Sequence, residues 1–133
     1  MKSLTKVLLA VLLLAGLVAT QENASSADHS PAYNPAQQVM FRGTVREFKD
    51  YQCPVSGTIG SHITVSNGYD TIEVHLAPAT FLKHNQIVLR PGDEVKVFGA
   101  MFMFERRPAM LARTVVTSDK TFTFRNDRGA PAW

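Results

Sequence analysis

The chain has 133 residues, of which 45% are apolar and 19% are charged, and its formal net charge is +3 at neutral pH. Two of the positive charges, Lys2 and Lys6, precede an unbroken apolar run over residues 7–18, and a mature chain without this segment carries only +1. A nearly neutral chain lacks the positive surface on which nucleic-acid binding depends, which argues against a nucleic-acid partner.

The basic and apolar N-terminus is typical of a secretory signal peptide over residues 1–20, with cleavage just after Ala19 or Thr20. A membrane-spanning helix needs about 20 apolar residues, more than this run offers. Residues 21–38 are rich in Ala, Ser, Asn, Gln and Pro and predict a flexible linker. The sequence therefore predicts a periplasmic or secreted bacterial protein, with one domain over residues 39–133 and no stable membrane span after cleavage.

The domain is predicted to consist almost entirely of β-strands. Residues 39–49 predict either a long first strand with a kink or bulge near Gly43 or a strand that ends by Glu47, because the apolar alternation is lost in the second half. Residues 51–60 predict a loop, which carries Cys53. This is the only cysteine in the chain, so an internal disulfide is excluded.

The strongest local signal is a hairpin over residues 60–76, in which two alternating runs flank Asn67-Gly68. A two-residue turn at Asn-Gly places His62 directly opposite Glu73. One face of the hairpin then carries the apolar side chains Ile63, Val65, Ile72, Val74 and Leu76. The other face carries His62, Thr64, Thr71, Glu73 and His75.

The second half of the domain predicts one short helix followed by strands. The helix is expected over residues 77–85, with Pro78 in its first turn and Asn85 at its stop. A Pro-Gly turn then leads into the next strand. The expected strands are residues 94–104 with a bulge or bend at Gly99, residues 109–116, and a short tail strand over residues 120–125.

This order of elements predicts an all-β fold. Five to six strands with one short helix between the third and fourth strands is the arrangement of an OB-fold β-barrel. The kinked first strand agrees with the bend that a barrel corner requires. A small antiparallel sandwich is the alternative architecture.

Several segments also carry a resemblance to a known group of proteins. They are the Glu-Val-His-Leu-Ala-Pro run at residues 73–78, the stretch over residues 89–99 and the closing Gly-x-Pro-x-Trp at residues 129–133. On these residues the chain resembles small exported bacterial OB-fold-like domain proteins, a largely uncharacterised group. The resemblance covers nearly the whole mature domain and implies the OB fold and export, but no reaction.

The candidate ligand-binding residues are His62, Glu73 and His75. Two imidazoles and a carboxylate on one face suit zinc, copper, iron or nickel. Cys53 on the preceding loop would complete a metal site, and its thiolate favours copper or zinc. The same pattern also fits histidines that pack against polar neighbours, with Glu73 orienting one of them.

Nucleophilic catalysis finds less support in the sequence. Cys53 with His62 or His75 would form a thiol–imidazole pair. However, the chain has no oxyanion-hole loop and no Gly-x-Ser-x-Gly turn, so no catalytic residue and no enzymatic activity are predicted.

The remaining candidate surface is an aromatic one. The residues Phe98, Phe102, Phe104, Arg106 and Arg107 resemble the stacking platform on which OB-folds bind single strands. Export and the low charge favour a core role for these rings instead. The sequence therefore predicts an exported binding or accessory module whose ligand is an unknown protein, metal or small molecule. The alternative is a periplasmic metal-binding (copper or zinc) or redox accessory protein that uses the His62, Glu73 and His75 face.

Overall fold

A computed structural model describes residues 32–133, so the predictions for the signal peptide and for the linker up to residue 31 lie outside the described residues. The elements are a 3-10 turn Pro35–Gln37, β1 Gln38–Gln52, β2 Ile59–Ser66, β3 Thr71–Pro78, α1 Ala79–His84, β4 Glu94–Phe104, β5 Arg107–Val116 and β6 Thr121–Thr123. The described part of the expected linker, residues 32–38, thus includes a 3-10 turn and the first residue of β1. In residues 32–133 no helix has the length and apolar content needed to cross a bilayer.

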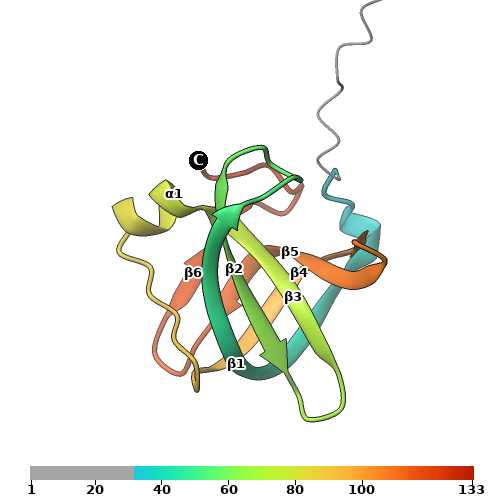
Figure 1. Cartoon of the computed structure of the whole chain (residues 1–133), viewed down its shortest axis with the longest axis vertical. Coiled ribbons are helices and arrows are strands. Elements are labelled where there is room, and N and C mark those ends of the chain that lie inside the picture. The colour runs from blue at the N-terminus through green and yellow to red at the C-terminus, as the bar shows by residue number, and fades with distance from the viewer. Residues whose placement is uncertain (1–31) are drawn as a thin grey trace, which may run out of the picture.

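The strands close into a barrel, as Figure 1 shows. The strand order is β3-β2-β1-β4-β5, with β6 added at the edge, and parallel pairing of β3 with β5 completes the ring. β1 pairs with two neighbouring strands, β4 along its first half and β2 along its second half. With α1 between β3 and β4, this is the predicted all-β OB-fold barrel rather than the sandwich.

Three register shifts bend the strands. One lies opposite Phe98 and Gly99, where the sequence predicts a bulge or bend, and its extra residue is Arg113 of β5. Another lies opposite Ser61 and His62 of β2, with Leu76 of β3 as the extra residue. The bulge in β1 lies between Val45 and Glu47, whereas the prediction placed it near Gly43. Gly43 is required for another reason, since a Cβ there would collide with the backbone carbonyl of Ser66 on β2. β1 continues past Glu47 to Gln52, so the alternative prediction of a first strand that ends by Glu47 is wrong.

The hairpin forms, but its predicted register is wrong by two residues. Ser66 pairs with Thr71, so residues 67–70 form a four-residue turn, and His62 lies opposite His75 rather than Glu73. The Asn67 side chain explains the longer turn, because its Oδ1 accepts the backbone N–H groups of residues 69 and 70 at 2.9 and 2.7 Å. A shift of two residues keeps every side chain on its predicted face.

The apolar face of the hairpin forms the barrel core. Its five predicted residues, Ile63, Val65, Ile72, Val74 and Leu76, are all buried. Leu82 of α1 and Phe124, which follows β6, join the same cluster. A polar strand face is usually exposed to solvent, but here His62 and His75 on the polar face are buried as well. A second, smaller buried layer therefore lies outside the main core.

The close approach of β4 and β5 at Gly99 gives a test of the fold. A Cβ at Gly99 would collide with the backbone carbonyl of Leu111, so we expect Gly99→Ala to lower the free energy of unfolding by about 3 kcal/mol. Gly68→Ala is the matched control, since a Cβ there meets nothing within 4 Å and only the φ of +93° opposes it, at a cost of about 1 kcal/mol. Urea unfolding measures the free energy of unfolding of both variants, and an equal decrease in the two would contradict the close approach of β4 and β5 at Gly99.

Candidate metal-binding site

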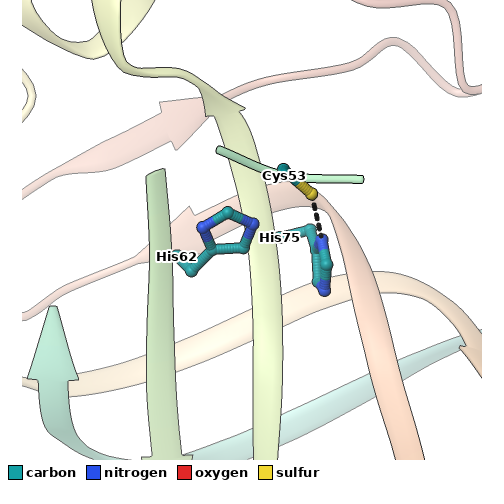
Figure 2. Close-up of side chains that lie close together, drawn as sticks. All are labelled: Cys53, His62 and His75. Atoms are coloured by element: carbon teal, nitrogen blue, oxygen red, sulfur yellow. Dashed lines mark hydrogen bonds between the residues drawn. The ribbon is translucent and has the colours of Figure 1, made fainter. Parts of the chain in front are cut away.

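Three of the four predicted site residues converge at one point. Cys53 follows the end of β1, His62 lies on β2 and His75 lies on β3, as Figure 2 shows. Each offers one ligand atom, and these atoms all lie within 4.8 Å of one another. Cys53 Sγ is 3.6 Å from His75 Nδ1. Cys53 and His62 are each 2% exposed and His75 is 7% exposed, so the cluster is buried.

The local backbone explains how the residues reach this point. The loop between β1 and β2 is closed by the Cys53 N–H, which donates to the Thr58 carbonyl at 2.9 Å, and by the Gly57 N–H, which donates to the Cys53 carbonyl at 2.8 Å. Gly60 makes room for the neighbouring imidazole, since a Cβ there would lie 3.0 Å from the His62 ring. The backbone thus positions the thiol and one imidazole independently of any ion.

Aromatic rings enclose the two imidazoles. The Tyr51 ring stacks on His62 with centroids 4.0 Å apart and planes 14° apart. Phe102 and Phe104 of β4 contact His75 edge-on at centroid distances of 5.1 and 4.7 Å. These two phenylalanines, considered above as part of a stacking platform, pack against an imidazole.

Burial determines the charge of both histidines. It lowers the pKa of His75 to about 3, with a smaller contribution from the charge of His62. Burial also lowers the pKa of His62, although the negative charge of Glu73 opposes this shift. A buried imidazole avoids protonation because the charged form loses its hydration. Both side chains are therefore neutral at neutral pH, which is the state in which imidazole binds a metal ion.

Glu73 lies on the other side of His75 and is not one of the three converging donors. Its Oε1 is 3.4 Å from His75 Nε2, but this contact is no ion pair because the imidazole is neutral. Glu73 instead accepts a hydrogen bond from the Tyr51 hydroxyl. Burial raises the pKa of Tyr51, and the hydrogen bond to Glu73 raises it further, so the phenol keeps its proton. His75 therefore has the thiol at one ring nitrogen and the carboxylate near the other.

The thiol–imidazole distance fits one of two arrangements. Bonds of about 2.3 Å to sulfur and about 2.0–2.1 Å to nitrogen, at a tetrahedral angle, place the two ligand atoms about 3.6 Å apart. A thiol that donates a hydrogen bond to the imidazole fits the same separation. His75 Nε2 and His62 Nδ1 are buried without a hydrogen-bond partner, which costs free energy.

A pocket of about 220 Å³ opens over the cluster. Cys53, His62 and His75 line it, together with apolar residues of the β3 end and the side chains of Arg125 and Trp133. The Arg125 guanidinium lies 4.9 Å from the centroid of the Trp133 ring, and its Nη1 donates to the Gly129 carbonyl at 3.0 Å. Figure 1 shows the C-terminal segment lying beside the loop between β1 and β2. This pocket connects the buried donors to solvent.

Tyr51 and the two phenylalanines were not predicted as part of the site. A signal for Phe102 and Phe104 does exist in the sequence, because the apolar run over residues 100–104 does not alternate. Such a run predicts a strand buried on both faces, but the structure leaves Met103 66% exposed. Phe102 and Phe104 are half-buried, and they pack against His75 on the polar face of the hairpin. The Tyr51–Glu73 hydrogen bond depends on the register of the strands, so no pattern in the sequence indicated it.

Comparison with known proteins gives one family match. A sequence profile of the MamS/MamX magnetosome protein family matches residues 37–122. No curated protein sequence matches the chain.

Two solved structures resemble it in fold. A replication protein A heterotrimer bound to ssDNA gives a TM-score of 0.47 at 19% identity, covering 63% of this chain and 59% of that chain. The S. pombe Stn1-Ten1 complex gives 0.49 at 16% identity, covering 71% of this chain and 75% of that chain. This chain thus spans about three fifths of the first structure's length. At these scores the likenesses carry no argument about function, and the strand order itself defines the fold.

The buried neutral imidazole of His75 makes stability depend on pH. Its pKa is about 3 in the folded protein, against about 6.5 in the unfolded chain, so only the unfolded chain takes up a proton between these values. Stability should therefore be lost as pH falls below 6.5, by about 2 kcal/mol at pH 5 from this residue. Urea unfolding of the metal-free protein at several pH values measures the slope.

The control for this prediction is a second histidine. His84 is exposed at the end of α1, so His84→Gln should keep the pH dependence of the parent protein, whereas His75→Gln should reduce it and leave the contribution of His62. An unchanged slope in His75→Gln would show that the acid sensitivity arises elsewhere.

Proposed function

The chain belongs to the MamS/MamX magnetosome protein family, and from this premise we propose that it is an exported accessory protein whose OB-fold barrel binds a copper or zinc ion. The observation that carries the proposal is the set of three buried donor atoms within 4.8 Å, supplied by a loop and two strands. Export follows from the signal peptide predicted over residues 1–20. Metal binding accounts for a buried polar cluster that barrel packing does not require.

The donor set suits these ions. Cys53 supplies a thiolate, and His62 and His75 supply neutral nitrogens. One thiolate with two imidazoles is a ligand set typical of copper and zinc, whereas magnesium and calcium prefer oxygen. The thiol loses its proton when the metal binds, so binding releases a proton. Closing the site around one ion requires the donors to approach one another by up to about 1 Å.

Glu73 has a supporting role in this proposal rather than that of a ligand. A histidine that binds a metal through one nitrogen commonly donates its other N–H to a carboxylate, which fixes the ring. His75 is placed for this arrangement, with Cys53 at Nδ1 and the Glu73 carboxylate 3.4 Å from Nε2, although no hydrogen bond forms at Nε2 in the ion-free protein. Tyr51 in turn holds Glu73 by donating its hydroxyl proton to the carboxylate. The sequence assigned Glu73 to the ion itself, and we propose the more distant role.

The same geometry favours binding over catalysis. A thiol nucleophile is activated by an imidazole that takes its proton and holds the resulting charge. His75 cannot do this at neutral pH because burial lowers its pKa to about 3. Cys53 is also only 2% exposed, which hinders approach of a substrate to its sulfur. We therefore propose no catalytic activity. A nucleic-acid ligand is likewise disfavoured, because Phe102 and Phe104 pack on His75.

Metal titration tests the proposal. The protein is expressed with its own N-terminus, purified untagged from the exported fraction and stripped of metal. It is then titrated with Zn(II), and with Cu(I) under anaerobic conditions, against a chromophoric chelator. We expect one equivalent to bind, and we expect the double variant His62→Ala/His75→Ala to lose at least about 100-fold in affinity.

The variant His84→Ala is the matched control because this histidine lies outside the cluster. It should bind like the parent protein. Far-UV circular dichroism and urea unfolding show whether the double variant still folds, and Cys53→Ser offers a milder replacement of the thiol. A parent protein that binds no tighter than the double variant would refute the metal site.

The role of Glu73 has its own test. Tyr51→Phe removes the hydroxyl that holds the carboxylate and keeps the ring that stacks on His62. Glu73→Gln removes the negative charge near His75 Nε2. Each substitution should weaken metal binding by about 10-fold or more without changing the stoichiometry. A Glu73→Gln protein that loses one ligand atom from the metal's coordination shell would instead show that Glu73 binds the ion directly.

A further inference from the structure

Resting on the proposed function, we propose that the ion is Cu(I), held by three protein ligands, and that it enters and leaves through the pocket over Cys53. The site would then carry an exchangeable ion rather than a permanent structural one. Three observations support this: the number of donors, the charge around them and the position of the pocket.

The first observation is the number of donors. Within residues 32–133 the cluster contains Cys53, His62 and His75 and no fourth member. The nearby carboxylate, that of Glu73, lies behind His75 and accepts the Tyr51 hydroxyl. Structural zinc sites are almost always four-coordinate. Cu(I) is stable with three ligands in a plane, and it favours a soft thiolate among them.

The second observation is charge. A thiolate and two neutral imidazoles carry −1, so Cu(I) makes the cluster neutral whereas Zn(II) leaves +1. The surroundings are aromatic, with Tyr51 stacked on one imidazole and Phe102 and Phe104 against the other. The charged side chains around the site are Glu73 near His75, Asp50, whose charge acts on His62, and Arg125 in the pocket wall. A net charge on the cluster itself, between these aromatic rings, costs solvation energy, which favours the monovalent ion.

The third observation is the pocket. The donor residues are at most 7% exposed, but all three line the cavity of about 220 Å³. One water molecule occupies about 30 Å³ of liquid, so the cavity has room for a ligand side chain or small chelator. An incoming sulfur ligand would approach the open side of a three-coordinate ion and form a fourth bond. Release of the ion then breaks its bonds to this chain, and Cys53 takes up one proton. No electron is transferred.

Metal preference and coordination number test the first half of the proposal. Anaerobic competition with bathocuproine disulfonate gives the Cu(I) affinity, and a zinc-binding dye gives the zinc affinity. We expect Cu(I) to bind at least about 1,000-fold more tightly than zinc. X-ray absorption at the copper edge should show one sulfur and two nitrogens.

The outcomes separate this inference from the function on which it rests. Tighter binding of zinc, or a fourth protein ligand on copper, would overturn the inference and leave a metal-binding protein. Failure to bind either ion would remove both.

Transfer kinetics test the second half. Thr58 is exposed and lines the pocket, so Thr58→Trp narrows the route to the donors without replacing any of them. We expect transfer of Cu(I) to excess bathocuproine disulfonate to slow at least about tenfold, while the equilibrium affinity stays the same. Thr121→Trp is the matched control, since Thr121 is exposed on β6 and does not line this pocket. Equal transfer rates in the two variants would show that the ion takes another route.

Discussion

The site depends on the burial of two imidazoles in their neutral form. Closure of the barrel produces that burial, because β3 pairs with β5 beside His75 while the β4 residues Phe102 and Phe104 contact its ring. Tyr51 covers His62 from β1. The cost is visible in the lowered pKa of both histidines and in two buried ring nitrogens without hydrogen-bond partners.

The polar layer and the apolar core share the same two strands. Ile63 and Val74 face the core, while His62 and His75 beside them face the aromatic layer. Because neighbouring side chains on a strand point to opposite faces, any shift of register by one residue would exchange the two layers. The packing of the core therefore also fixes the position of the donors. The barrel thus holds the three side chains of the cluster in place without a disulfide, since its only cysteine, Cys53, belongs to the cluster.

The sequence predicted the fold and named all three residues that converge in the cluster, and the errors have physical causes. Side-chain alternation assigned each hairpin residue to its face, and that assignment survived a register error of two residues. The register itself depended on the Asn67 side chain, whose bonds to the turn backbone compete with a two-residue turn. Cys53 was named as a candidate from the sequence, but the loop conformation that brings it beside the histidines could not be read from the residue pattern. Glu73 was assigned to the ion because the wrong register set it opposite His62, and its bond to Tyr51 depends on tertiary structure.

The most direct test of the account is the response of individual histidine rings to one equivalent of Cu(I), followed by 15N NMR of the imidazole nitrogens. The account predicts that His62 and His75 change together while the exposed His84 does not. Loss of the effect in Cys53→Ser would place the thiolate in the same site. Unchanged signals from His62 and His75 at saturating Cu(I), or an equal change at His84, would contradict it.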